Sequence, residues 1–282
     1  MSIKTTNQYF FRILRSSARA LGLHVLLSSA RALRERHKWE SVIVHNEPFT
    51  HIPPAIAMPL LCGHLKGTWR CPDNLTIVLI HNYEKTPLME QSLRYAGIAN
   101  YVVLKPVYEG EWRDSIKLTT LLNYLQSGAC QTEFLLYADS RDAFLRAEPQ
   151  KAITYLQELN CDCLFSSESA CYGYECMPEI KAWANQNAVT HGYQEQYINT
   201  GVFFGRTKFI SELLQEAKQY IVPTEFSRAE FRQHLFAGSL CNVLPDFPKG
   251  VGSDQQIIRW LHPHFYPRMQ CDYAGHLAVP RP

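Results

Sequence analysis

The chain has 282 residues, of which 46% are hydrophobic and 19% are charged, so it is long enough for one large α/β domain or two smaller ones. Its net charge of +2 gives no overall attraction to nucleic acid, and its 11 histidines are scattered along the sequence. No apolar run reaches the length of about 18 residues that crosses a bilayer, so we expect no membrane span.

The nine cysteines are an odd number, and we recognise no secretory signal at the amino terminus. We therefore expect a reducing, cytoplasmic location in which most cysteines are buried thiols. Cys161, Cys163, Cys171 and Cys176 lie close in sequence, but no pair has the two-residue gap of a zinc knuckle. This spacing argues against a zinc site.

Residues 1–38 form a basic amphipathic extension, because no acidic residue precedes Glu35 and arginines alternate with apolar side chains. The hexapeptide Ser-Ser-Ala-Arg-Ala-Leu occurs at 16–21 and again at 28–33. Such a segment can contact an anionic membrane surface, act as an organelle transit peptide, or pack on the domain as a basic helical pair. Residues 39–74 are irregular and rich in proline, which indicates an accessory or connecting region.

Regular alternation of strands and helices begins at Leu75, so residues 75–282 are predicted to be one α/β domain with an open, mixed, mostly parallel sheet flanked by helices. The segment 222–248 is predicted to be loop-like, and its phenylalanines either pack on the sheet or line a groove. We expect strands at 75–80, 101–104, 134–138, 163–167 and 197–205, and helices at 87–96, 115–125, 148–159, 210–220 and from Ser253 or Asp254 onward.

Asp139 and Asp142 follow directly after the uninterrupted apolar run Phe134 to Ala138, which is typical of a strand buried on both faces. In an open parallel sheet, ligands bind outside the carboxyl ends of the strands, so both carboxylates would lie at the mouth of a crevice. Two such acids can converge on one hard divalent cation and leave room for phosphate oxygens. The alternative is that they only cap the turn that follows.

One loop and one lysine are candidates for binding a nucleotide. His81, Asn82, Tyr83 and Glu84 form the loop after the first strand, at the edge where a base or ribose docks. Lys117 lies in the first turn of a predicted helix, where it is either a solvated surface lysine or a partner of a diphosphate.

Further along the chain, polar and aromatic residues again follow or interrupt strands. Glu168 and Tyr172 could form one wall of a sugar pocket, since aromatic rings stack on sugars and carboxylates accept hydroxyl hydrogen bonds. Asn199 and Gly201 lie on a strand where glycine allows close approach of a ligand, although a simple bulge in an edge strand gives the same pattern. Asp254 either caps its helix or points into the crevice.

Four segments in this order resemble one known family: Ala138-Asp-Ser-Arg-Asp, Phe165-Ser-Ser-Glu-Ser, Tyr197-Ile-Asn-Thr-Gly-Val-Phe-Phe-Gly and Ser253-Asp-Gln-Gln. Together they are similar to the glycosyltransferase domain of the procollagen lysyl hydroxylase family and, more broadly, to metal-dependent glycosyltransferases of the GT-A fold. The resemblance extends from about Leu75 to Asp272. It implies a GT-A-like sheet and glycosyl transfer.

The resemblance also implies roles for individual residues. Asp139 and Asp142 match a manganese site, which magnesium could also occupy, and Lys117 falls near a lysine of the preceding helix. The remaining matches concern the donor or the acceptor: Glu168, Tyr172, Asn199, Gly201 and Asp254.

Two departures from the family pattern stand out. Val202 follows Gly201 where the family has a second glycine. The family supplies a histidine to the metal beyond the last matching strand, and His276 is the histidine of this chain that could substitute for it. Water or a phosphate oxygen could fill the same position.

On this basis we expect a metal-dependent enzyme that transfers a hexose from UDP-glucose or UDP-galactose to a hydroxyl of a glycan, a lipid-linked sugar or a protein. Asp254, Glu168 and Asn199 would act on the sugar and acceptor. A sugar-1-phosphate nucleotidyltransferase is a weaker alternative, because the loop 81–86 contains no glycine to cradle phosphates. A non-catalytic module that binds nucleotide sugars or associates with a membrane remains a further alternative.

Overall fold

The computed structural model describes residues 58–59, 66–67 and 69–277. Contacts divide the chain into two units, Met1–Leu60 and Leu61–Pro282, and the fold below is that of the second unit. The predictions for residues 1–38, and nearly all of those for residues 39–74, lie outside the described residues.

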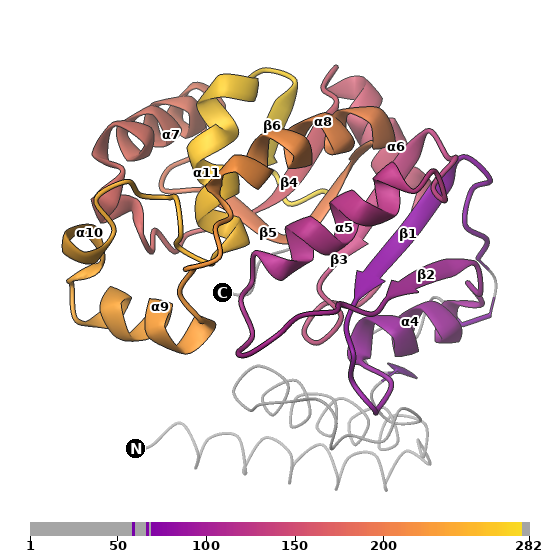
Figure 1. Ribbon diagram of the computed structural model, residues 1–282. Helices are drawn as coiled ribbons and strands as arrows, with labels where there is room; N and C mark the ends of the chain where they lie inside the picture. The colour runs from indigo at the N-terminus through magenta and orange to yellow at the C-terminus, as the bar shows by residue number, and fades with distance from the viewer. Residues whose placement is uncertain (1–57, 60–65, 68, 278–282) are drawn as a thin grey trace, which may run out of the picture. The chain divides into compact units, whose positions relative to one another are not determined.

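The described part of the second unit alternates strands and helices along most of its length (Figure 1). The strands are β1 (Leu75–Ile80), β2 (Tyr101–Leu104), β3 (Phe134–Ala138), β4 (Cys163–Glu168), β5 (Tyr197–Arg206) and β6 (Met269–Asp272). The helices are α4 (Leu88–Ala96), α5 (Ile116–Gln126), α6 (Gln150–Glu158), η3 (Tyr174–Cys176), α7 (Pro178–Thr190), α8 (Thr207–Ala217), η4 (Lys218–Tyr220), α9 (Arg228–Phe236), α10 (Leu240–Val243) and α11 (Asp254–Phe265).

The strands form one sheet in the order β2-β1-β3-β5-β4-β6. All of them run parallel except β5, which is inserted antiparallel between β3 and β4. In this register Ala138 at the end of β3 pairs with Val202, and Glu168 at the end of β4 pairs with Tyr197. The first half of β5 therefore lies at the same sheet edge as the carboxyl ends of its neighbours.

Apolar side chains on the two faces of the sheet belong to two separate cores. Leu121 of α5, Leu213 of α8 and Ile257 of α11 pack on one face, and Figure 1 shows these three helices in front of the sheet. Leu93 of α4 and Leu156 of α6 belong to the core of the other face. Both faces of β3 are covered, as its continuous apolar sequence predicts.

The expected sheet class is confirmed, and every predicted strand and helix of this domain is present with bounds close to those expected. The prediction of a loop over 222–248 is wrong, because the segment contains α9 and α10. No residue of α9 is fully buried, so the sequence lacks the apolar periodicity of a core helix. The signal that could have revealed α9 is the capping box formed by Ser227 and Glu230.

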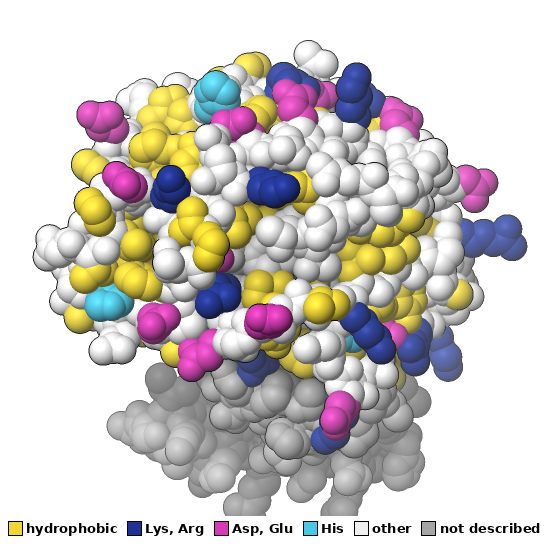
Figure 2. Space-filling view, viewed as in Figure 1, with side chains coloured by type: hydrophobic (Ala, Val, Ile, Leu, Met, Phe, Trp, Pro, Cys, Tyr) yellow, Lys and Arg dark blue, Asp and Glu magenta, His cyan; other side chains and the backbone are white. Residues whose placement is uncertain are grey.

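The phenylalanines of this segment have different environments. Phe226, Phe231 and Phe247 pack on the core, whereas the Phe236 side chain is 77% exposed. Helix α7 and strand β6 were not predicted from the sequence. Over the face of Figure 1, basic and acidic side chains are interspersed among apolar ones (Figure 2).

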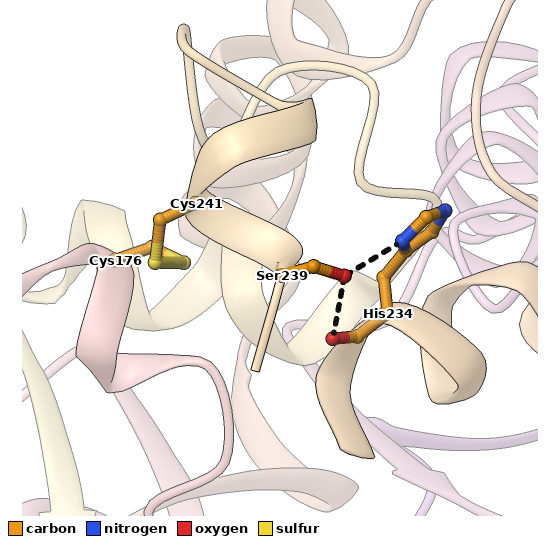
Figure 3. Close-up of a disulfide and its surroundings, with 4 residues drawn as sticks. All are labelled: Cys176, His234, Ser239 and Cys241. Atoms are coloured by element: carbon orange, nitrogen blue, oxygen red, sulfur yellow. Dashed lines mark hydrogen bonds between the residues drawn. A yellow bond between two sulfur atoms is a disulfide. The ribbon is translucent and has the colours of Figure 1, made fainter. Parts of the chain in front are cut away.

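The cysteines only partly follow the expectation of buried thiols. Cys71, Cys161, Cys163 and Cys271 are buried and free, but Cys176 and Cys241 form a disulfide (Figure 3). This disulfide departs from the pattern expected of a reducing compartment. None of the helices within the described ranges combines the length and apolar character required to cross a bilayer.

Gly205 of β5 is required by the close approach of β4. A Cβ atom on Gly205 would lie 2.6 Å from the carbonyl oxygen of Asp162, a backbone atom that cannot move aside. We predict that Gly205→Ala lowers the free energy of unfolding by about 2–3 kcal/mol, measured by urea denaturation. Gly110→Ala is the control, since Gly110 has open space around it and only its positive φ opposes alanine. Equal destabilisation by both variants would contradict this account.

Candidate functional site

Polar side chains from separate parts of the chain meet at the edge of the sheet where β3 and β4 end. Asp139 follows β3, and Glu168 is the last residue of β4. Asn199 comes from the first half of β5, while Lys117 and Asp254 lie in the first turns of α5 and α11. The predicted convergence of these side chains is therefore present in the structure.

Lys117 is the centre of this group. Its Nζ lies 2.8 Å from Asp254 Oδ2 and 3.3 Å from Asp139 Oδ1. The exposed fractions of the side chains are 13% for Lys117, 6% for Asp254 and 32% for Asp139. Lys117 is thus a buried counter-ion between two carboxylates and not a solvated surface lysine.

Neutral groups complete the environment of the two carboxylates. The Tyr137 hydroxyl donates to Asp139 Oδ1 at 2.7 Å, and the Thr200 hydroxyl donates to Asp254 Oδ2 at 3.0 Å. The Asp139 amide donates to the Gly201 carbonyl at 2.6 Å. A Cβ atom on Gly201 would lie 2.8 Å from Asn199 Oδ1 and 3.3 Å from Asp139 Oδ2. A side chain at position 201 would therefore have to displace the Asn199 amide, which accepts from the Gly201 amide and donates to Glu168.

Glu168 is fixed by hydrogen bonds to both of its carboxylate oxygens. Gln255 Nε2 and Arg259 Nη2 donate to Oε1 at 2.6 and 2.8 Å, and Asn199 Nδ2 donates to Oε2 at 2.9 Å. The Arg259 side chain is fully buried and also donates to the carbonyls of Ile198, Tyr172 and Ala170. Because a buried charge needs such partners, Arg259 locks Glu168 and the loop after β4 in one arrangement.

The buried charges shift one another's pKa values. Burial raises the pKa of Asp139, and the nearby negative charge of Asp142 adds to this rise while Lys117 opposes it. Burial likewise raises the pKa of Asp254 against the opposing effect of Lys117. Burial alone would lower the pKa of Lys117, but the charges of Asp139 and Asp254 outweigh it and raise that pKa well above the usual range.

The other predicted site residues occupy different environments. His81 is buried, with Nε2 at 3.4 Å from Glu90 Oε2 of α4, and burial lowers its pKa. Asn82 and Asp142 are exposed, as is Tyr172, whose side chain is 56% exposed and whose carbonyl accepts from Arg259. None of these four contacts Lys117 in the described part of the chain.

His276 lies apart from Lys117. Its ring stacks on Tyr155 of α6 at 4.3 Å, and its backbone amide donates to Asp272 Oδ1. Among the described residues, no group of three or more His, Cys, Asp or Glu side chains is close enough together to hold a metal ion. Asp139, Asp142 and His276 therefore do not form a ready three-ligand cluster.

The two aspartates alone retain features that suit a divalent cation. Both carboxylates supply hard oxygen donors, and their negative charges are close enough for Asp142 to raise the pKa of Asp139. The contacts of Asp139 with Lys117 and Tyr137 both involve Oδ1. The chemistry of these two donors therefore suits a magnesium or manganese ion.

Several residues of the site were not assigned a role from the sequence. Tyr137 lies within an apolar strand and Arg259 within an amphipathic helix, so both resembled core positions. Tyr83, in contrast, belongs to the loop that was predicted to bind a base or ribose; it is 50% exposed and stacks on His81 at 5.5 Å. Burial raises the pKa of Tyr83, and the charges of Asp139 and Asp142 contribute to this rise. Thr200 and Gln255 were identified only through their hydrogen bonds.

Comparisons with known proteins give little guidance. No protein-family model matches the chain, and no curated protein matches it. A solved structure described as a glycosyltransferase involved in the glycosylation of the major capsid of PBCV-1 is similar with a TM-score of 0.38 and 15% sequence identity. The match covers 70% of this chain and 80% of that chain. A similarity of this size carries no functional information by itself.

The lysine between the carboxylates yields a prediction with a defined pH dependence. Lys117→Met removes the counter-ion of the buried Asp254 and of the partly exposed Asp139, so we expect the free energy of unfolding at pH 8 to fall by about 3 kcal/mol. Loss of Lys117 raises both carboxyl pKa values further above the unfolded value of about 3.9. A group with a raised folded pKa stabilises the protein below its unfolded pKa, and this stability is lost as pH rises through the folded pKa.

The loss in Lys117→Met is therefore expected to be smaller at pH 5 than at pH 8, as measured by urea denaturation at each pH. Lys208→Met serves as the control because Lys208 is exposed. A loss for Lys117→Met that does not change between these pH values, or that matches the loss for Lys208→Met, would contradict the central position of the lysine charge.

Proposed function

We propose that this protein is a metal-dependent glycosyltransferase that moves a hexose from a nucleotide sugar, UDP-glucose or UDP-galactose, to a hydroxyl of a glycan, a lipid-linked sugar or a protein. The observation that carries the proposal is the meeting of Lys117, Asp139, Glu168, Asn199 and Asp254 at the carboxyl edge of an open α/β sheet. Ligands of such sheets bind at this edge.

The diphosphate of the donor would bind beside Asp139. In this proposal Asp139 and Asp142 hold a divalent cation, which when bound supplies Lewis-acid stabilisation of the departing diphosphate. Lys117 keeps the Asp139 carboxylate charged and aimed at that position. Its ammonium group also adds positive charge close to the phosphates.

The nucleoside and the sugar would contact different walls. The exposed ring of Tyr83, supported by its stack on His81, offers a surface for the base, and Asn82 lies beside it in the loop after β1. On the other side, Tyr172 offers an exposed ring to a sugar face. In this proposal the nucleoside would bind beside the loop after β1 and the sugar beside the loop after β4.

The sugar and acceptor hydroxyls would be oriented by Glu168 and Asn199. Their mutual hydrogen bond and the Arg259 contacts fix both side chains before any ligand arrives, which lowers the cost of orienting the substrate. Asp254 has a raised pKa and lies on the other side of Lys117, so we assign it the role of taking the acceptor's proton.

One specific observation favours a second function, the binding of a nucleotide sugar without transfer. Lys117 contacts both Asp139 and Asp254, and the described residues hold no complete set of three protein ligands for a metal. A site in which the lysine remains the only cation would bind UDP through charge but would not stabilise the leaving group fully. This function predicts UDP binding that does not depend on metal and no turnover.

Calorimetric titration of UDP, with and without manganese, distinguishes the two functions. For the transferase we expect manganese to strengthen UDP binding, and Asp142→Ala to weaken the manganese-dependent binding by roughly tenfold or more. Asp142 is suited to this test because it is exposed, so its replacement should leave the fold intact.

Asp246→Ala is the matched control, because Asp246 is also exposed but lies on the segment after α10. Release of UDP from UDP-glucose and UDP-galactose in the presence of manganese then tests turnover. UDP binding that is unaffected by manganese and by Asp142→Ala, together with no turnover, would overturn the transferase and leave the binding module.

A further inference from the structure

The disulfide joins two segments that both lead to the candidate site. Cys176 is the last residue of η3, in the segment that follows Glu168 and Tyr172. Cys241 lies on α10, and the segment after α10 leads to Asp254. The two cysteines are 65 residues apart in sequence, and β5 and α8 lie between them. Figure 3 shows the bond linking the short helix of Cys176 to α10.

Apart from the disulfide, α9 and α10 are attached by a small number of buried groups. No residue of α9 is fully buried, although Phe231 and Leu235 pack partly buried on the core, and Leu240 is the buried residue of α10. The two helices are linked to each other by Ser239, whose hydroxyl lies 3.0 Å from His234 Nδ1 and donates to the His234 carbonyl (Figure 3). Because buried apolar contacts of this pair are few, the covalent link is a large part of its attachment.

The chain leading into α9 holds the start of α5. The Ser115 hydroxyl donates to Glu225 Oε2 at 2.6 Å, and the Arg113 side chain donates to the Glu225 carbonyl. The Arg228 amide donates to the Trp112 carbonyl at 2.9 Å. Lys117 lies in the turn of α5 that these contacts position.

The segment after α10 also contacts the start of α5, and it contacts the segment before α9. The Phe226 amide donates to the Gly250 carbonyl at 3.0 Å, and the Ser115 amide donates to the Gly252 carbonyl at 3.2 Å. Gly252 adopts a φ of +66°, and a Cβ atom there would lie 2.0 Å from the Phe226 carbonyl oxygen. Segments 225–228 and 250–252 therefore pack tightly together, directly before Asp254.

We propose that the Cys176–Cys241 disulfide is a redox-sensitive clamp on the candidate site. In the oxidised protein it holds α9 and α10 against η3, so that the segments flanking these helices keep Lys117 and Asp254 aligned. In the reduced protein the clamp opens, and the starts of α5 and α11 lose this support. The proposal concerns regulation of the site and rests on the function proposed above.

The reductant is a dithiol. Its thiolate attacks one sulfur of the disulfide and forms a mixed disulfide, while the other sulfur leaves as a thiolate and takes a proton. The second thiol of the reductant then closes a cyclic disulfide and releases the first cysteine as a thiol. Two electrons and two protons pass to the protein, and Cys241, on an exposed position, offers the more open approach.

Hydrogen exchange of the full chain, followed by mass spectrometry, tests the clamp without relying on any ligand. We expect reduction with dithiothreitol to raise amide exchange in 112–118 and 250–256 by at least tenfold, and a Cys176→Ser, Cys241→Ser double variant to show the same rise without reductant. Cys171→Ser is the matched control, since it removes a free cysteine from the segment that follows Glu168 and keeps the disulfide.

UDP affinity in the presence of manganese, measured for the same samples, tests the link to the site. We expect an affinity about tenfold weaker in the reduced protein and in the double variant, and unchanged in Cys171→Ser. Unchanged exchange after reduction, the absence of a Cys176–Cys241 peptide pair from the oxidised protein, or faster exchange with unaltered UDP affinity would each overturn the clamp. If UDP binds neither form, the proposed function fails, and the exchange rates still decide whether the clamp positions these helices.

Discussion

The ion pairs that Lys117 makes with Asp139 and Asp254 are the interaction on which the rest of the site depends. The buried carboxylate of Asp254 and the partly exposed carboxylate of Asp139 are tolerated side by side at this edge because one ammonium group contacts both. The three residues belong to α5, to the end of β3 and to α11, so their pairing fixes the ends of three separate elements. The same ion pairs therefore balance the charges of the site and hold these elements in place.

The antiparallel strand β5 contacts both the Lys117 ion pairs and the other polar residues of the site. Its consecutive residues Asn199, Thr200 and Gly201 bind, in turn, Glu168, Asp254 and the Asp139 amide. A parallel strand at this position would begin at the opposite edge of the sheet. Its first residues would then lie away from the edge where Asp139 and Glu168 are found. The reversed direction of β5 thus connects the Glu168 and Arg259 network with the Lys117 cluster.

Much of the fold and part of the site could be predicted from the sequence. Continuous apolar runs such as Phe134–Ala138 fix strands, and polar residues that interrupt or follow them identify the edge where Asp139, Glu168 and Asn199 meet. The sequence alone does not decide the orientation of Asp254. In the structure its carboxylate contacts Lys117 and Thr200, and Ser253 provides no side-chain cap to α11.

The remaining features depend on tertiary contacts that leave little trace in a single sequence. Tyr137 and Arg259 occupy positions with the periodicity of core residues, and only their partners reveal them as polar anchors. Helix α9 buries too little to show a pattern, and the pairing of Cys176 with Cys241 spans most of the domain's second half. The roles of such residues can be recognised only in the folded structure.

The most direct test of the central claim is a crystal structure of the protein with UDP and manganese. We predict that the diphosphate lies at the carboxyl edge of β3, with the metal on Asp139 and Asp142 and the Lys117 ammonium beside the phosphates. UDP bound at another place, or at this edge with neither Asp139 nor Asp142 in contact with metal, would contradict this prediction.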